Sequence, residues 1–387
     1  MRLRPVNRVI PVLVLMALAL LWSLDFVSIQ ANRIVPGSSL GLVAAVGMRW
    51  ALGLSGVLAL CGLLAAYVRR PPYGVLLALL CLLLAQLPLS LAWVGEQHIT
   101  AELAHARVGI GAGFWGLLFL LGLLSIELQQ RVRLHRAGLL GIGLGLLLLT
   151  LGVAHLGGLE PLALMREYQS RRQQFSSALY SHLGLVAAAV GVSLLLGAGL
   201  ALLINRFPAI QRSCMGLLSV IQTIPSLALF GLLIAPLSYL SAQFPLLQQF
   251  GVRGIGWAPA LLALIAYSLL PIVRNIGVAL QAVEPSVIDA AHGMGMSPRQ
   301  VFFQVRLPLA LPVIIEGVRV TTLQAIGLTA VAALIGAGGF GTFIFQGLGQ
   351  AAMDLIVLGA LPILLMALLA DSLFSLLAAH YRGVPAP

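Results

Sequence analysis

The chain contains no lysine, because all 22 of its basic residues are arginine. A phosphate-binding P-loop needs a lysine that reaches the phosphates of the nucleotide, so this chain cannot carry one. If ATP drives its activity, another subunit must bind that ATP. The net charge of +11 comes from arginines scattered between apolar runs, with no basic stripe. This pattern favours membrane orientation and contact with anionic lipid over nucleic-acid binding.

Residues that carry chemistry are also scarce. The three cysteines, Cys61, Cys81 and Cys214, lie in or beside apolar runs and show neither metal-ligand spacing nor a disulfide framework. His98 and His105 are seven residues apart without a third ligand, which is a weak pattern for a metal site. No G-x-S-x-G motif is present. We therefore expect no catalytic residue and no metal site, which argues against an integral membrane enzyme.

Apolar residues dominate what is there. Hydrophobic residues make up 60% of the chain, charged residues only 9%, and the mean hydropathy is +1.05. Apolar runs near 20 residues predict membrane-spanning helices, so we expect an all-α polytopic membrane protein. We place ten spans, at about 9–29, 50–68, 73–94, 112–128, 138–158, 183–205, 216–240, 258–276, 309–335 and 356–379.

These spans predict two blocks of five helices. Residues 1–158 form an N-terminal accessory region, residues 159–182 an amphipathic linker, and residues 183–380 a second block. Arginine asymmetry favours both termini in the cytoplasm, which places fourteen arginines inside and seven outside. Three of the seven outside arginines, Arg166, Arg171 and Arg172, lie in the linker, and they are the weak point of this orientation.

The interval 284–308 is the longest polar-containing stretch of the second block, and the predicted orientation puts it in the cytoplasm. It predicts two short helices joined by a turn at Gly293 or Gly295, with Ser297 as the N-cap of the second helix. Ala290 and Ala291 would leave a flat face that another backbone could approach closely. Asp289, Arg299 and Arg306 would offer charges to a partner. A solvated loop without a partner remains the alternative.

The same interval resembles a known motif. Asp289-Ala290-Ala291 is followed after three residues by Gly295, after nine more by Val305, and after one more by Leu307-Pro308. This spacing is similar to the EAA loop of ABC-importer permeases, with Asp289 replacing Glu and Val305 replacing Ile. Three further segments resemble the glycine betaine/choline/carnitine (osmoprotectant) branch: residues 222–226, 270–275 and 335–341. The resemblance covers roughly residues 178–380, and the preceding region is similar to that of the longer members.

The resemblance implies a permease subunit with a five-helix, type I ABC-importer core in the inner (plasma) membrane. It implies import of a compatible solute, glycine betaine or a similar quaternary ammonium compound. A cytoplasmic ABC ATPase would bind ATP and Mg²⁺. A periplasmic or membrane-tethered binding protein would deliver the solute, and a second permease copy or related permease would complete the path. The coupling loop that docks on the ATPase would use Asp289, Ala290, Ala291, Gly295, Arg299, Val305, Leu307 and Pro308.

Polar residues also interrupt two of the predicted spans. Proline in a span frees a backbone carbonyl, and such broken helices often line a pathway, although a packed kink is the alternative. Glu316 and Arg319 share a helix face and can pair, with a gate as the second interpretation. Asp371 is expected to be interfacial. The candidate pathway or gate residues are Gln222, Thr223, Pro225, Ser226, Glu316 and Arg319.

Residues 336–341 match G-x-G-x-x-G, but a dinucleotide site needs a preceding strand, and here a long apolar helix precedes. We expect a flexible turn on the outside. The resemblance implies that it helps to seat a binding protein, with Gly338, Gly339 and Asp354 of the outer loop as candidate contacts. A secondary transporter that needs no ATPase is the alternative function. It should show inverted repeats and acidic residues at mid-membrane, and neither is apparent.

Overall fold

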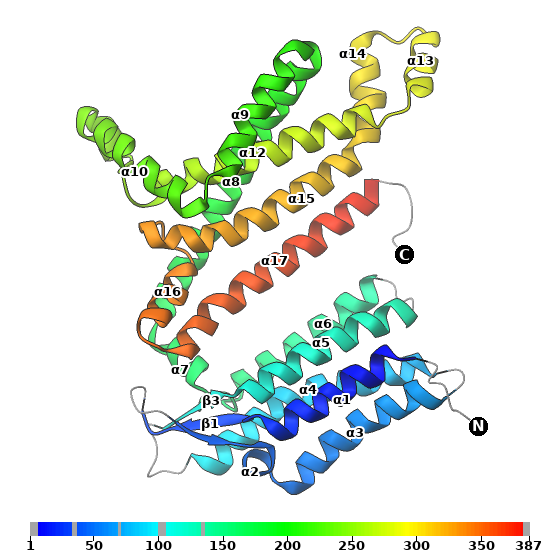
Figure 1. Ribbon diagram of the computed structural model, residues 1–387, viewed down its shortest axis with the longest axis vertical. Coiled ribbons are helices and arrows are strands. Elements are labelled where there is room, and N and C mark those ends of the chain that lie inside the picture. The colour runs from blue at the N-terminus through cyan, green and yellow to red at the C-terminus, as the bar shows by residue number, and fades with distance from the viewer. Residues whose placement is uncertain (1–6, 33–36, 69–70, 100–105, 133–135, 382–387) are drawn as a thin grey trace. The chain divides into compact units, whose positions relative to one another are not determined.

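A computed structural model describes residues 7–32, 37–68, 71–99, 106–132 and 136–381. These residues are mainly helical, because nearly every segment is an apolar run whose backbone polar groups are satisfied within a helix (Figure 1). They divide into two compact units that are joined between Ser170 and Arg171. The junction lies inside the predicted linker 159–182.

The first unit is a helical bundle with a leucine-rich core. Helix α1 packs on α3 and α5, and α4 packs on α3, α5 and α6. Leu58, Leu76, Leu83, Leu117 and Leu121 are fully buried between these helices. The helices are α1 (Val9–Ser23), α2 (Leu42–Val46), α3 (Met48–Tyr67), α4 (Tyr73–His98), α5 (Ala112–Val132), α6 (Arg136–His155) and α7 (Ala163–Ser170).

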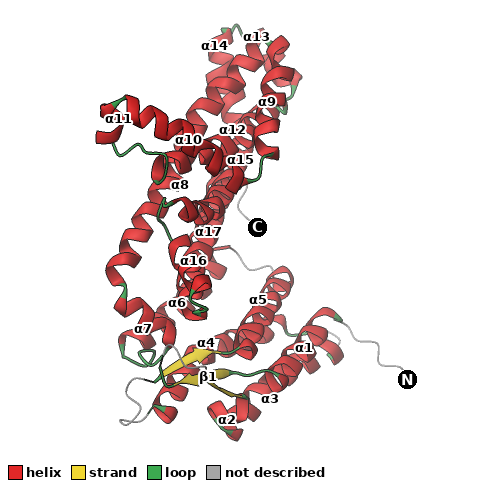
Figure 2. Cartoon of the chain, turned by 60° about the vertical axis from the view of Figure 1, so that its left-hand side comes forward, coloured by secondary structure: helices red, strands yellow, loops and turns green. Residues whose placement is uncertain are grey.

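A small antiparallel sheet also belongs to this unit (Figure 2). Its strand order is β2 (Ser38–Leu40), β1 (Val27–Gln30), β3 (Arg107–Ile110), and Val27 is paired with both Leu40 and Ile110. The sequence pattern does not predict it, because each strand is only three or four residues long and the paired strands β1 and β3 are more than 70 positions apart. Valine and isoleucine recur at alternate positions in β1 and β3, which is the local signal for a strand.

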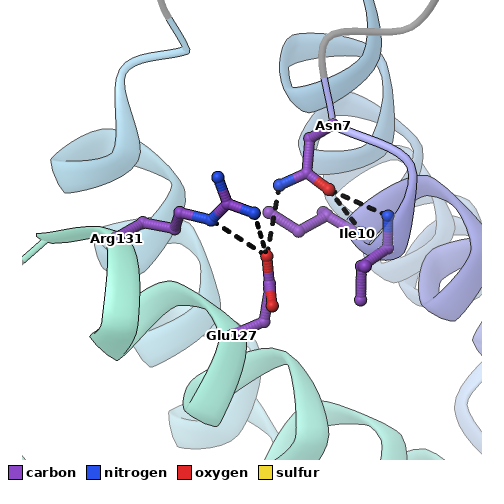
Figure 3. A network of polar contacts seen from close by, with 5 residues as sticks. Asn7, Ile10, Glu127 and Arg131 are labelled. Atoms are coloured by element: carbon purple, nitrogen blue, oxygen red, sulfur yellow. Dashed lines mark hydrogen bonds and ion pairs between the residues drawn. The ribbon is translucent and has the colours of Figure 1, made fainter.

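A polar network fixes the start of α1 (Figure 3). The Asn7 Oδ1 atom accepts from the backbone N–H groups of Val9 and Ile10, at 2.9 and 3.2 Å, so Asn7 satisfies two donors of the first turn of this helix. Its Nδ2 atom donates to Glu127 Oε1 at 3.4 Å, and the same oxygen accepts from Arg131 Nε at 3.1 Å. The start of α1 is therefore tied to α5 by a shared carboxylate.

The second unit contains long helices that pack around α12. Helices α8 and α15 both contact α12, α17 contacts α15, and α9 and α10 lie against α12. The helices are α8 (Arg172–Arg206), α9 (Gln211–Thr223), α10 (Ser226–Gln243), α11 (Pro245–Gln249), α12 (Trp257–Gln281), α13 (Pro285–Gly293), α14 (Pro298–Gln300), α15 (Leu307–Ala332), α16 (Gly341–Gly349) and α17 (Met353–Tyr381), with 3-10 turns at Pro208–Ile210 and Ala333–Ile335 and a π-helical segment at Val301–Arg306.

Each of the ten predicted spans contains a helix, but the first, 9–29, is helical only to Ser23 and its last residues belong to β1. In the part of the chain that the structure describes, eight helices are long and apolar enough to cross a membrane. The first and fifth predicted spans contain the shorter apolar helices Val9–Ser23 and Gly141–His155. The predicted linker is helical in both of its parts, because α7 and the first turns of α8 occupy most of it. The all-α polytopic fold is confirmed.

Candidate functional site

Helix α13 ends in a turn that requires glycine at one position. The Gly295 N–H donates to His292 O at 2.9 Å, and the Met296 N–H donates to Ala291 O at 3.2 Å. This pair of bonds ends a helix when the residue after the C-cap adopts the left-handed conformation. Gly295 is that residue, and its φ is +81°. Gly293 is the last helical residue. The chain therefore turns at Gly295, one of the two predicted positions.

The second short helix begins at a capping box. The Ser297 Oγ atom accepts from the Gln300 N–H at 3.4 Å, and Gln300 Oε1 accepts from the Ser297 N–H at 2.8 Å. The predicted N-cap at Ser297, with Pro298 at the first helical position, is confirmed. From there the chain runs through the π-helical segment Val301–Arg306 into α15, with Pro308 in its first turn.

The 284–308 loop is also fastened to the end of α12. The Arg306 Nε atom donates to Leu280 O at 2.9 Å, and Leu280 is in the last turn of α12. Carbonyls in the last turn of a helix have no partner within the helix, and an arginine there satisfies one of them. Ile288 and Phe302 pack against the buried cluster at the same place. The loop is thus held to both helices that it connects.

The loop presents a mixed surface. Asp289, Ala290, Arg299 and Pro308 are exposed, while Val305 and Leu307 are half-buried. Ala291 is only 1% exposed, so the expectation of one flat face made by both alanines is wrong. Neighbouring positions on a helix point about 100° apart, so one alanine packs inside the chain while the other faces outward. Sequence reasoning also missed two exposed apolar side chains, Met294 and Phe303.

The predicted interruption of the span 216–240 is a true break between α9 and α10, at Ile224 and Pro225. Two reciprocal hydrogen bonds hold it to α12. The Gln222 Nε2 atom donates to Tyr267 O at 2.8 Å, and the Tyr267 hydroxyl donates to Ile224 O. Tyr267 thereby satisfies a carbonyl that the break leaves outside the helix. The sequence did not point to Tyr267, because this contact joins residues 43 positions apart.

The other two candidate residues of this region have local roles. The Thr223 hydroxyl donates to Val220 O at 2.7 Å, in the last turn of α9, and Ser226 is the first residue of α10. Whether these residues line a pathway stays a prediction.

An ion network joins α15 to α17. Arg319 Nη1 donates to Glu316 Oε2 at 2.9 Å, and Arg319 Nε and Nη2 lie 2.8 and 2.7 Å from Asp371 Oδ1. The predicted pairing of Glu316 with Arg319 is confirmed. Asp371 is more than an interfacial residue, since it is the partner that links the two helices. An acid within an apolar run calls for such a partner, which is the sequence signal that could have found it.

The glycine loop, residues 336–341, follows α15 at the end opposite to α13 (Figure 1). Gly336, Gly338 and Gly339 all have positive φ, between 78° and 81°. Gly338 is half-buried and Gly339 is buried, so Gly338 is the more accessible of the two predicted glycine contacts. Asp354 is in the first turn of α17 rather than in a loop, where a negative charge suits the helix dipole.

Nothing in the described ranges forms a metal centre of three or more histidine, cysteine or carboxylate side chains. Cys61, Cys81 and Cys214 are free. The features that stand out are therefore the 284–308 loop, the broken helix, the ion network and the glycine loop. All four belong to the second unit.

Two family descriptions match the chain. Residues 193–383 match the binding-protein-dependent transport system inner membrane component, and residues 7–165 match the N-terminal domain of the ABC transporter permease YehY. Among solved structures, a chain of the MetNI methionine ABC transporter in an inward-facing conformation is 18% identical, with a TM-score of 0.46, and the match covers 55% of this chain and 98% of that one.

Curated relatives match at higher identity. The osmoprotectant import permease protein OsmW of Salmonella typhimurium is 40% identical over 51% of this chain and 86% of that protein. The carnitine transport permease protein OpuCB of Listeria monocytogenes is 33% identical over 58% of this chain and 94% of that protein. The choline transport system permease protein OpuBB of Bacillus subtilis is 34% identical over 54% and 87%. This chain belongs to the inner membrane permeases of binding-protein-dependent ABC importers, among the osmoprotectant permeases, in a long form with an extra N-terminal domain.

Proposed function

We propose that this chain moves glycine betaine or a similar quaternary ammonium compound into the cytoplasm in an ATP-driven importer. Carnitine and choline, named for two of the relatives, are quaternary ammonium compounds, and the third relative is named for osmoprotectants. Two independent sequence features, the loop motif and the arginine asymmetry, agree with this function. In the proposed orientation both termini and the 284–308 loop are cytoplasmic.

The observation that carries the proposal is the construction of the 284–308 loop. Helix α13 presents Asp289 and Ala290 to the outside, while Gly295 fixes its end and Arg306 ties the loop to α12. A partner that pulls on α13 would therefore move α12 and α15 rather than bend a slack loop. We propose that an ATPase subunit, which binds ATP and Mg²⁺, docks here and switches the core between two states.

The remaining partners follow from the same proposal. A periplasmic or tethered binding protein would dock at the opposite end of the second unit, near Gly338 and Asp354. A second permease, either another copy or a related chain, would complete the path. Recognition of the quaternary ammonium group usually relies on an aromatic cage, which we assign to the binding protein.

The test is co-purification in detergent from a strain that expresses the neighbouring genes. Wild type is compared with Asp289→Arg, which reverses an exposed charge on α13. Gln249→Arg is the matched control, because it introduces the same side chain at an exposed position of α11, outside the loop. We expect an ATPase subunit with wild type and control, and its loss with Asp289→Arg. An ATPase that is absent from wild type, together with uptake that survives ATP depletion, would instead support a secondary transporter.

A further inference from the structure

His182 is a fully buried polar residue on α8 that none of the features above uses. Its Nδ1 atom lies 3.3 Å from the backbone nitrogen of Phe340, and its Nε2 atom lies 3.1 Å from Ile326 O. A backbone N–H can only donate, so Nδ1 must be the acceptor. The ring proton then sits on Nε2 and donates to Ile326 O. Both ring nitrogens are thus satisfied by one neutral tautomer.

The imidazole ring also forms the seat of the glycine loop. A side chain at Gly339 would place its Cβ atom 3.0 Å from His182 Nδ1, so the backbone can approach the ring this closely only because Gly339 has no Cβ. The Phe340 ring lies 5.8 Å from the imidazole, centroid to centroid, and Phe175 packs edge-on against Phe340 at 5.0 Å. The loop is therefore fixed to α8 by polar and apolar contacts at one point.

The two hydrogen bonds of His182 reach two different segments. Ile326 is on α15, the helix that follows the 284–308 loop in the chain. Phe340 lies after α15, in the glycine loop. One side chain on α8 thereby holds the glycine loop in register with the helix that leads to it. A displacement of α15 relative to α8 must stretch or break at least one of these bonds.

A cavity of about 400 Å³ borders the glycine loop within the second unit. The loop supplies one wall, through Gly338 and Gly339, and α8 supplies another. None of its lining residues is charged, and most offer amide or hydroxyl groups: Gln173, Gln174, Ser177, Ala178, Ser181, Gly338, Gly339, Thr342, Phe343 and Gln346. A shift of the loop would change the shape of this surface.

We propose that His182 is a positioning residue that sets the glycine loop and its neighbouring cavity for the docking of the substrate-binding protein. This proposal rests on the function proposed above. The positioning depends on the two hydrogen bonds that the ring nitrogens make, one as acceptor and one as donor. Nδ1 accepts from the loop, Nε2 donates to α15, and a side chain that keeps only one of these contacts should keep only part of the function.

Two variants separate the contacts. In His182→Asn, the amide lies close to the place of Nδ1, so its oxygen can still accept from the Phe340 N–H. In His182→Gln, the amide lies close to the place of Nε2 and can only reach Ile326 O. Ser193→Ala is the matched control, because Ser193 is equally buried on α8 and its hydroxyl donates to Ile265 O on α12, away from the loop.

The first measurement is hydrogen exchange at the Phe340 amide in the full-length purified chain, which needs no partner. We expect protection in wild type, His182→Asn and Ser193→Ala, and exchange at least about tenfold faster in His182→Gln, which corresponds to about 1.4 kcal/mol. Equal protection in wild type and His182→Gln would overturn the positioning role, whatever the protein transports.

The second measurement titrates solute-loaded binding protein against ATP hydrolysis by the complex with its ATPase. We expect His182→Gln to raise the KM for the binding protein about tenfold with little change in the maximal rate, and His182→Asn to restore it. An equal rise in KM with Ser193→Ala would reduce His182 to a packing residue. No stimulation of wild type by any binding protein would refute the proposed function itself, while the exchange result would still decide the positioning.

Discussion

At the scale of single residues, the turn that ends α13 depends on backbone conformation rather than on side-chain contacts. Gly293 and Gly295 are two positions apart, and a Cβ atom at either would meet nothing within 4 Å. They differ in φ, since only Gly295 lies in the left-handed region. Because the space around both glycines is open, they form a controlled comparison, in which any difference between the two substitutions comes from the backbone.

We expect Gly295→Ala to weaken the binding of the ATPase subunit by about 5- to 30-fold, because a left-handed alanine costs about 1–2 kcal/mol. Gly293→Ala should leave binding unchanged, since alanine favours the helical conformation that Gly293 already has. A binding isotherm with the purified ATPase subunit measures both. Equal affinities for the two variants would show that the turn at Gly295 does not shape the docking surface.

The ion network gives a second prediction at this scale. Arg319 contacts Asp371 across two helices but contacts Glu316 within one helix. We expect Asp371→Asn to lower the melting temperature of the purified protein by a few degrees, and more than Glu316→Gln does, because only the first loosens α15 from α17. Exchanging the charges, with Arg319→Asp and Asp371→Arg together, should recover part of the loss. A larger effect of Glu316→Gln would contradict the network as described.

At the scale of elements, α9 and α10 form one predicted span that is broken at Ile224 and Pro225. Proline cannot donate to the preceding turn, and Tyr267 satisfies the exposed carbonyl from outside the helix. The Gln222 side chain in turn donates a hydrogen bond to the backbone carbonyl of Tyr267, so the break is held by two hydrogen bonds. The geometry of the break therefore depends on α12 as well as on α9 and α10.

We therefore expect Tyr267→Phe to destabilise the second unit by about 0.5–1.5 kcal/mol, the usual net contribution of one intramolecular hydrogen bond. Tyr239→Phe is the control, because Tyr239 lies on α10 and is largely exposed. Unfolding midpoints in a denaturant series measure both variants. Matching midpoints for Tyr267→Phe and wild type would mean that the joint does not need the hydroxyl.

Local sequence was enough to predict features built from neighbouring residues. The apolar runs predicted the helices, Ser297 and Gln300 lie within one capping box, and Glu316 and Arg319 are one turn apart. The contacts of Asp371, Tyr267 and His182 were not predicted, because each joins residues more than 40 positions apart, although Asp371 itself was singled out as interfacial. The sheet of the first unit was not predicted, for the same reason. Pairing over such distances is set by the packed fold and leaves only weak local signals.

At the scale of the whole molecule, the two units have separate hydrophobic cores, and every feature tied here to transport lies in the second. That unit carries the 284–308 loop at one end of α15 and the glycine loop at the other. We propose that ATP hydrolysis on a partner subunit is coupled to the solute path through the 284–308 loop.

The most direct test is uptake of radiolabelled glycine betaine into proteoliposomes that hold this chain with its ATPase subunit. Loaded binding protein is added outside, and ATP or a non-hydrolysable analogue is enclosed. We predict uptake that requires hydrolysis, that Asp289→Arg abolishes, and that Gln249→Arg leaves intact. Uptake that continues with the analogue and follows an imposed ion gradient, in wild type and Asp289→Arg alike, would contradict the account.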